Sequence, residues 1–374
     1  MEAFHTPVSP AGVFLLSTKL NNSDFTNLQE FIIIYVNKMF GLFLKQTLKS
    51  PKYDIVSIGD TTIDSFIELE EASVHCDVNH ADCQLCLSYA NKIPYKDLTV
   101  LPAGNSTNNA VGSARLGMKN AFITSVGSDD QGKMIINELK SEGIDTQFIK
   151  VNQGVKTNSH FVLSFKGERT ILIKHNKFTY ALPERLDTKW IYFSSMAQGT
   201  EEFHKQLGQF LKRNSNVKVS FNPGTFQMRM GTKKLADIYK RTEVLFLNRE
   251  EAQLVTQIQS RDIKTLAQGM HKLGAKVAVI TDGREGSYAS DGNKIWFLDS
   301  YQGPRIEATG AGDAFGTAFT SALFYGKSVS EAMVWGTING GNVVMHIGPH
   351  KGLQTKQQIE NYMKKNPKFR PKEA

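Results

Sequence analysis

The segment EATGAGDAFGTAFTSALFYG, residues 307–326, places small residues directly before an acid and an apolar run. The turn at Gly310, Ala311 and Gly312 precedes a helical pattern, so its backbone N–H groups would lie at a helix N-terminus, which favours a phosphate. Asp313 comes next and could accept the proton of an attacking hydroxyl. The segment therefore predicts phosphoryl transfer to an alcohol, although a tight turn, an N-cap and a buried helix face would need the same residues.

Two other phosphate-binding patterns are absent from the sequence. No G-x-x-x-x-G-K-[ST] motif occurs in the chain. The segment after the first expected strand reads SIGDTTID, residues 57–64, and does not contain G-x-G-x-x-G. Phosphate binding would therefore depend on the turn before Asp313.

The elements that must position this turn follow an alternating pattern from Tyr53 onward. Short β-rich runs alternate with segments of helical period, which is typical of a mostly parallel sheet covered by helices, built as one continuous domain. Strands are expected at 53–59, 120–127, 190–194, 217–222, 242–248 and 276–281, and helices at 108–117, 131–143, 201–213, 249–258 and 263–275.

Two segments interrupt the alternation. Residues 159–176 contain two strand-like runs around Lys166, Gly167 and Glu168, which predicts a β-hairpin. Residues 68–101 leave the main pattern after the first strand and return only at VLPAG. Both segments could be surface decoration, or they could form a small sheet that covers a site at the strand ends.

The composition limits the class of protein. The chain has 374 residues, of which 40% are hydrophobic, and a formal net charge of +8. We expect a globular protein with a solvated basic end at 364–372 and, because no basic groove with interleaved aromatic residues is visible, no nucleic-acid partner. The apolar segment Phe31–Phe43 is interrupted by Asn37 and Lys38 and is shorter than the ~20 residues of a membrane-spanning helix. No membrane partner is therefore expected.

The three cysteines, Cys76, Cys83 and Cys86, lie in the segment HCDVNHADCQLC together with His75 and His80. A small odd number of cysteines argues against a disulfide framework and favours a reducing compartment, so we expect a cytoplasmic protein. A structural zinc ion at these cysteines is the alternative, because Cys83 and Cys86 have C-x-x-C spacing. The spacing of the other candidates favours reduced cysteines instead.

Two motifs, one of them in the segment described first, resemble signatures of a known family. Residues 307–315 resemble a C-terminal signature close to D-T-x-G-A-G-D-x-F. The segment AGNSTNNA, residues 103–110, with Gly117 and Gly127 at the expected intervals, resembles an N-terminal Gly-Gly-x-x-x-Asn signature. With both motifs in this order, the chain is similar to the ribokinase or PfkB family of carbohydrate and nucleoside kinases over roughly residues 53–353.

The resemblance implies a ribokinase-like α/β fold, a three-layer α/β/α sandwich with a mostly parallel central sheet and a small β-sheet lid. Residues 51–356 would form the kinase domain, with the lid from about 66–102 and 155–176. Residues 1–50 stay an unassigned extension, and residues 357–374 would hold the end of a helix and a basic tail.

The family's site residues can be carried over by position. Asp313 would be the catalytic base, and the amides of Gly310, Ala311 and Gly312 the anion hole. Substrate contacts fall on Asp64, Gly104, Asn105, Asn108 and Arg169, nucleotide contacts on Thr281, Gly283, Asn339 and Asn342, and Mg²⁺ ligands on Asn248 and Glu251.

Each of these assignments has a structural alternative. Asp64 could cap a loop, Asn248 and Glu251 could cap a helix, and Arg169 could be a solvated residue at a hairpin tip. Asn339 and Asn342 could serve core packing.

The resemblance leaves several questions open. Glu307, Ala308 and Ala103 stand where the family usually has Asp, Thr and Gly. Glu307 and Ala308 keep a non-catalytic ligand-binding relative as an alternative to an ATP- and Mg²⁺-dependent kinase. A monovalent cation and a homodimer formed through the lid are further expectations. The substrate would be a sugar, or else a nucleoside if two of the candidate stacking residues line the pocket; these are Phe66, Tyr89, Tyr95 and Phe161.

Overall fold

The structure is a computed structural model that describes residues 51–77, 83–166 and 168–374, so Phe31–Phe43 and His80 lie outside the described part. Residues 51–374 form one unit. Among the described residues, no helix is both long enough and apolar enough to cross a membrane.

The central sheet has the order β16-β15-β14-β13-β12-β11-β10-β1-β6-β7. From β13 to β7 all neighbours are parallel, whereas β14, β15 and β16 pair in antiparallel fashion. The inner parallel strands include nearly continuous apolar runs, such as residues 244–247 and 277–280, because helices cover both of their faces. The strands are β1 (Tyr53–Ile58), β6 (Asn120–Gly127), β7 (Ile149–Asn152), β10 (Thr188–Phe193), β11 (Lys218–Phe221), β12 (Val244–Asn248), β13 (Val277–Thr281), β14 (Ser287–Ser290), β15 (Ile295–Leu298) and β16 (Lys372–Glu373).

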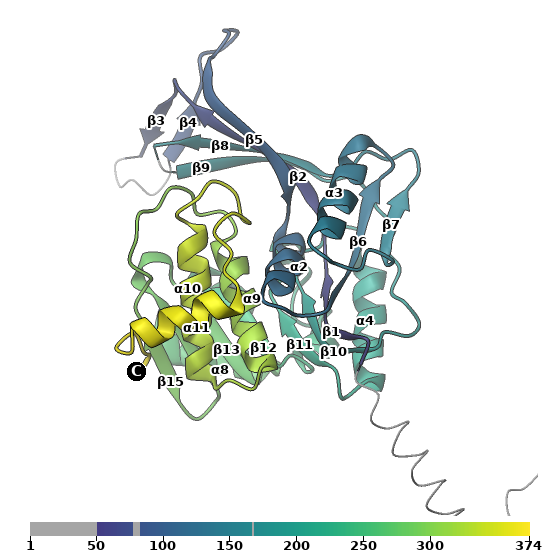
Figure 1. The fold of residues 1–374 in the computed structure, drawn as a ribbon, viewed down its shortest axis with the longest axis vertical. Coiled ribbons are helices and arrows are strands. Elements are labelled where there is room, and N and C mark those ends of the chain that lie inside the picture. Colours follow the sequence, from purple (N-terminus) through teal and green to yellow (C-terminus); the bar gives the residue numbers. More distant parts are fainter. Residues whose placement is uncertain (1–50, 78–82, 167) are drawn as a thin grey trace, which may run out of the picture. The chain divides into compact units, whose positions relative to one another are not determined.

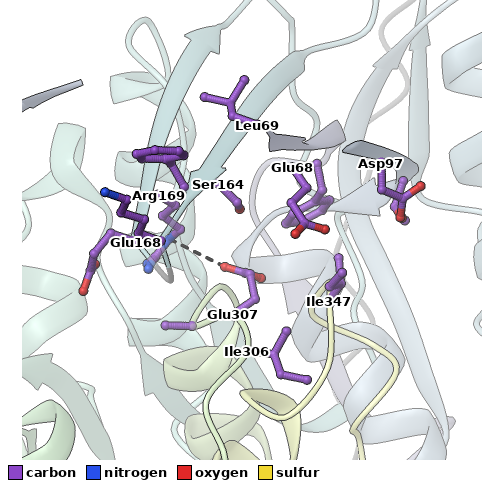
Figure 2. A pocket seen from close by; sticks show the side chains of 14 residues that line it. Glu68, Leu69, Asp97, Ser164, Glu168, Arg169, Ile306, Glu307 and Ile347 are labelled. Carbon is purple, nitrogen blue, oxygen red and sulfur yellow. Dashed lines mark ion pairs between the residues drawn. The ribbon is translucent and has the colours of Figure 1, made fainter. Parts of the chain in front are cut away.

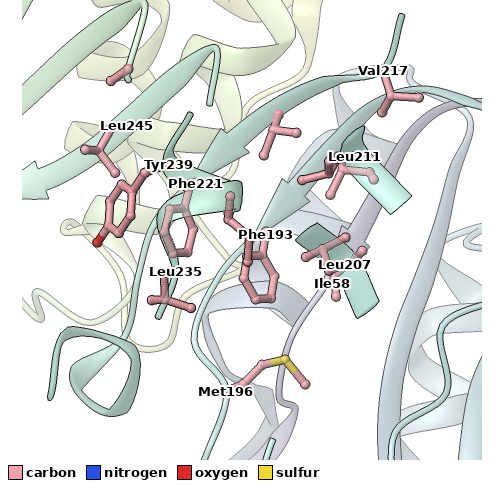
Figure 3. Packing of buried hydrophobic residues seen from close by; sticks show 14 of the residues in the cluster. Ile58, Phe193, Met196, Leu207, Leu211, Val217, Phe221, Leu235, Tyr239 and Leu245 are labelled. Atoms are coloured by element: carbon pink, nitrogen blue, oxygen red, sulfur yellow. The ribbon is translucent and has the colours of Figure 1, made fainter. Parts of the chain in front are cut away.

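Helices form the two outer layers (Figure 1). The two faces of the sheet pack into two separate cores. In β1, Val56 packs with the helices of one layer and the adjacent Ile55 packs with those of the other. Figure 3 shows the first of these cores, where Phe193 and Phe221 stack at 5.2 Å between ring centroids. This confirms the three-layer fold. The helices are α2 (Asn105–Arg115), α3 (Asp130–Ser141), α4 (Glu201–Arg213), α5 (Thr225–Met230), α6 (Ala236–Tyr239), α7 (Arg249–Thr256), α8 (Ile263–Leu273), α9 (Ala311–Phe324), α10 (Val329–Val343) and α11 (Lys356–Lys365), with a 3-10 turn η1 (Gly283–Glu285).

A smaller sheet forms the lid, with the order β5-β2-β8-β9. Its strands are β2 (Thr62–Leu69), β5 (Tyr95–Ala103), β8 (Ser159–Phe165) and β9 (Glu168–Lys174). The predicted hairpin is confirmed, because β8 pairs with β9 over the whole of both strands. Figure 1 shows the lid strands extending beyond the body of the molecule, with the short hairpin of β3 (Ser73–Cys76) and β4 (Cys83–Cys86) beside them.

The structure corrects the prediction of three reduced cysteines. Cys76 and Cys83 are opposite each other in the β3–β4 hairpin, with 4.0 Å between their Cα atoms, and they form a disulfide. Cross-strand pairing brings their side chains together, which the linear spacing did not show. Only Cys86 remains a free thiol. The cysteine argument for a reducing compartment therefore no longer holds, and two of the proposed zinc ligands are no longer thiolates.

The C-terminal segment also differs from the predicted solvated end. Phe369 packs against the second core, and its ring lies 6.0 Å from that of Tyr362. The chain then adds β16 to the edge of the central sheet, opposite β15. An apolar anchor and a free strand edge thus order a segment whose composition is mostly polar and basic.

Candidate active site

The turn before Asp313 is built as the start of α9. Gly310 has φ of 81° and precedes the helix, and a Cβ added there would lie 2.4 Å from Cβ of Pro349, so this position requires glycine. A Cβ at Gly312 would meet nothing within 4 Å. No side chain caps this helix start. The Ala311 N–H makes a long bond of 3.3 Å to the Ala308 carbonyl, which closes the turn.

Asp313 is buried, with 8% of its surface exposed. Burial raises its pKa to about 6, against the opposing effect of hydrogen bonds from Asn108 and Asn105. The Asn108 Nδ2 group donates to Oδ2 of Asp313 at 2.7 Å. A carboxylate with a pKa near neutrality is suited to accept and return a proton.

Asp60 lies between β1 and β2, Asp64 lies on the lid strand β2, and both line the cavity that contains Asp313. Thr62 donates its hydroxyl to Asp64, and Nδ1 of His160 lies 3.3 Å from the Asp64 carboxylate. Asp60 accepts hydrogen bonds from the Tyr180 hydroxyl and from the Ala197 N–H, the latter at 2.6 Å. Burial raises the pKa of Asp60 to about 6.

Three of these cavity residues were not predicted: Asp60, His160 and His175. Asp60 carried a sequence signal, since it is a second acid four residues before Asp64 in the same segment. His160 lies on β8 and His175 directly follows β9, and their Nε2 atoms are 3.3 Å apart. His175 also lies 3.7 Å from Asp60. Only the folded hairpin brings these imidazoles over the two acids, so spacing alone could not reveal them.

Most of the predicted site residues line one cavity of about 730 Å³. It contains the start of α9, the acids Asp60 and Asp64, and the ends of β12 and β13. The predicted residues that line it are Asp64, Gly104, Asn105, Asn108, Arg169, Asn248, Glu251, Thr281, Gly310, Gly312 and Asp313.

A second cavity of about 560 Å³ adjoins the first and shares Gly312, Asn248 and Thr281 with it. Gly283, Ala311, Gly340 and Gly341 line it, and Arg305 and Tyr301 stand at its wall. The start of α9 is therefore accessible from both cavities.

Asn339 and Asn342 line neither cavity. The Asn339 amide is buried, donating to the Ala314 carbonyl at 2.9 Å and accepting from the Gln354 N–H at 2.8 Å. Asn342 donates to the Ile338 carbonyl of its own helix at 2.8 Å. Their contacts match the structural alternative, and the neighbouring Gly340 and Gly341 border the cavity instead.

Asn248 and Glu251 cap α7 reciprocally while they line the main cavity. The Asn248 N–H donates to Oε2 of Glu251 at 2.9 Å, and the Glu251 N–H donates to Oδ1 of Asn248 at 2.8 Å. Burial raises the pKa of Glu251, and the negative charges of Asp313 and Glu250 add to this shift. A cation between these acids would offset their repulsion.

Arg169 connects the lid to the loop before the α9 turn. Its Nε lies 3.9 Å from Oε1 of Glu307, which also accepts from the Thr309 N–H at 2.7 Å. Figure 2 shows this pair beside a small cavity of about 150 Å³, lined by Glu68 and Asp97 of the lid. Oε2 of Glu307 is buried and has no hydrogen-bond partner among the described residues.

None of the four candidate stacking residues lines the main cavity within the described chain. Phe66 is buried and lines only the small cavity. Tyr89, Tyr95 and Phe161 are exposed on the lid. The condition set for a nucleoside substrate is therefore not met by these residues.

The fold and the site together define the protein as a small-molecule kinase of the ribokinase fold. The chain belongs to the pfkB family of carbohydrate kinases, whose family model matches residues 54–356. This confirms the resemblance found in the two signatures.

Known relatives cover most of the chain. Ribokinase from Haemophilus influenzae is 26% identical over 304 residues, which span 76% of this chain and 95% of that protein. The 5-dehydro-2-deoxygluconokinase from Clostridium beijerinckii is 26% identical over 339 residues, 84% of this chain and 94% of that protein.

Solved structures share the fold. The nucleoside kinase from Methanocaldococcus jannaschii has a TM-score of 0.69 at 20% identity and covers 85% of this chain and 100% of its own. Arabidopsis thaliana ribokinase, complexed with ribose and ATP, has a TM-score of 0.66 at 19% identity and covers 84% of this chain and 99% of its own.

Proposed function

We propose that this enzyme transfers the γ-phosphate of ATP to a hydroxyl group of a sugar. The observation that carries the proposal is the position of Asp313: a buried carboxylate with a pKa of about 6 directly after an uncapped helix start, in one cavity with Asp64. Such a carboxylate takes the proton from the attacking hydroxyl while the amides at the start of α9 stabilise the charge on the transferred group.

Asp64 would fix the sugar in the cavity. Its carboxylate accepts hydrogen bonds from hydroxyl groups, and neighbouring hydroxyls of a sugar can supply two donors. Asn105 and Gly104 line the same end of the cavity. In this arrangement the sugar lies between the lid and the α9 turn, with one hydroxyl near Asp313.

The residues around the second cavity suit ATP. Gly312, Gly340 and Gly341 line this cavity. Gly312 has open space where a side chain would be, at the start of α9. Thr281 and Gly283 would hold the nucleotide on the opposite wall. ATP, when bound, supplies the phosphoryl group, and its phosphates would meet the α9 amides between the two cavities.

The side-chain oxygens of Asn248, Glu251 and Glu307 suit two cations. Asn248 and Glu251 would hold Mg²⁺, which prefers oxygen ligands and keeps several waters when it binds through one carboxylate and phosphates. The unpartnered Oε2 of Glu307 would be an oxygen ligand for a monovalent cation, because burying a carboxylate oxygen without a partner costs free energy. Mg²⁺ would neutralise charge on the phosphates, and a monovalent cation would compensate Glu307.

A sugar is favoured because the main cavity presents hydroxyl-binding groups such as Asp64, Asn105 and Asn108. The curated relatives named above include a ribokinase and a 5-dehydro-2-deoxygluconokinase, both of which act on sugars by name. Both observations support the sugar assignment.

The test measures ATP consumption with Mg²⁺ across neutral sugars, sugar acids, sugar phosphates and nucleosides, with Asp313→Asn beside the wild type. We expect turnover of one sugar class that falls by about 10²-fold or more in Asp313→Asn, because the positioned base is lost. Asp130→Asn, which removes an exposed acid on α3, serves as the control and keeps full turnover. Full activity of Asp313→Asn, or preferential turnover of a nucleoside, would contradict the proposal.

We further propose that the outer face of the lid pairs two copies of the chain. His160 and Ile173 are opposite each other in the β8–β9 pair, and both line the cavity. Successive residues of a strand point to opposite faces, so the next pair, Phe161 and Leu172, faces outward. Leu98 and Val100 of β5 share this outer face through β2. All four side chains are exposed, by 42% to 53%, and exposed apolar residues gathered on one sheet face in this way are typical of an interface.

A further inference from the structure

The amide of Asn108 has a defined orientation in the active site. An ionised carboxylate has only acceptor atoms, so the Asn108 atom 2.7 Å from Asp313 must be the donor Nδ2. The other amide atom, Oδ1, therefore points the opposite way. It lies 3.0 Å from Nε2 of His350.

This orientation determines the role of the imidazole. Since Oδ1 of Asn108 only accepts, Nε2 of His350 must carry a proton and donate it to this hydrogen bond. His350 is buried, and its pKa is lowered to about 4 by burial and by the positive charge of Arg115. The ring is therefore neutral at physiological pH, with its single proton on Nε2.

The backbone around His350 is held firmly. Nη1 of Arg115 donates to the His350 carbonyl at 2.5 Å, and the same guanidinium pairs with Glu142 at 2.5 Å. The preceding Pro349 packs against Gly310 at the start of α9. The imidazole is thus fixed relative to the turn that precedes Asp313.

We propose that His350 is a positioning residue for the phosphoryl transfer: its Nε2–H fixes the Asn108 amide so that Nδ2 donates to the base Asp313. A flipped amide would place two donors face to face at His350 and an oxygen against the Asp313 carboxylate. Without an imidazole donor, the first of these penalties disappears, and only the contact with the Asp313 carboxylate then disfavours the flipped amide. This inference rests on the proposed function, in which Asp313 accepts the substrate proton.

Charged groups from several elements act on this chain of hydrogen bonds. Arg115, Glu142 and Asp64 act on His350, and Glu251 interacts electrostatically with Asp313. The Asn108 hydrogen bond lowers the pKa of Asp313 against the effect of burial. Loss of an oriented Nδ2 donor therefore moves the pKa of Asp313 upward, while the other charges stay in place.

The test is the pH profile of kcat/KM for the wild type, His350→Leu and His350→Gln. In the wild type the acid-side midpoint is expected at about 6. His350→Leu should raise that midpoint by about one pH unit, which is about a tenfold loss of kcat/KM at low pH. His350→Gln keeps a donor at nearly the same reach and should restore the profile. If His350→Leu does not fold, His350→Asn takes its place, and its midpoint should rise by the same amount.

His204→Leu is the matched control, because His204 is another buried histidine, on α4, that does not line the cavity. Its midpoint should equal that of the wild type. An unchanged midpoint in both His350→Leu and His350→Asn, or an equal shift in His350→Gln, would overturn the proposal. The absence of any turnover by the wild type would instead overturn the proposed function, so the two failures are distinguishable.

Discussion

At the scale of single residues, the two glycines of the α9 turn have opposite structural requirements. Gly310 adopts a positive φ and lies against Pro349, whereas Gly312 lies in the first turn of the helix beside open space. Side chains at these two positions should therefore separate folding from phosphate binding.

We predict that Gly310→Ala destabilises the protein by about 1 to 3 kcal/mol, through an unfavourable backbone conformation and a contact with Pro349. Gly312→Ala should instead leave the free energy of unfolding unchanged or raise it by up to about 1 kcal/mol, since alanine favours helix. Both variants should lose turnover, the second because its methyl group occupies the phosphate cradle. Urea unfolding and ATP consumption measure the two effects. A fully active Gly312→Ala would refute the cradle.

The sequence was sufficient to name Asn108 and Asp313 within the two signatures and Asp64 outside them, three candidates that line one cavity in the structure. It was not sufficient for His160, His175 and His350, which are far from the signatures and enter the site only through lid pairing or a late loop. Single histidines in strand or loop segments carry no local pattern, so their contacts became visible only in three dimensions.

At the scale of secondary structure elements, the regular βα alternation predicted the parallel part of the sheet, because buried parallel strands and amphipathic helices have distinct periods. The antiparallel strands β14, β15 and β16 were missed. β14 and β15 are four residues each and β16 is two, and the last pairs with β15 from a distant part of the chain. Short strands of this kind depend on tertiary pairing rather than on local pattern.

The register of the lid strands leads to a prediction about assembly. Leu172→Lys places a charge on the outer apolar face, so it should convert the proposed dimer to a monomer while its side chain stays away from the cavity. Light scattering over a concentration series measures this. Met134→Lys, at an exposed apolar residue of α3, is the control and should leave the dimer intact. A monomeric wild type, or a Leu172→Lys dimer as stable as the wild type, would show that the lid face does not pair two copies.

At the scale of the whole molecule, the buried acids of the site lower the stability of the folded protein. Asp313 and Asp60 are both buried carboxylates whose pKa is raised from 3.8 to about 6. The folded state therefore binds more protons than the unfolded state between these values, so their contribution to stability falls as pH rises from about 4 to about 6. Above pH 6 the ionised, desolvated carboxylates persist only because the rest of the fold holds them.

The same Asp313→Asn variant that removes turnover should therefore be more stable than the wild type at pH 8. A shift of about two pKa units corresponds to at most about 3 kcal/mol, and most of this gain should be lost near pH 4, where the carboxyl group is protonated in the folded state and about half protonated in the unfolded state. Because Asp60 and His350 are the same in both proteins, the difference between their urea unfolding curves at the two pH values isolates Asp313. Asp130→Asn, at an exposed acid, should show no such pH-dependent gain. If Asp313→Asn were less stable than the wild type at pH 8, the carboxylate would be stabilising the fold, and its burial would not be a cost that the enzyme bears for catalysis.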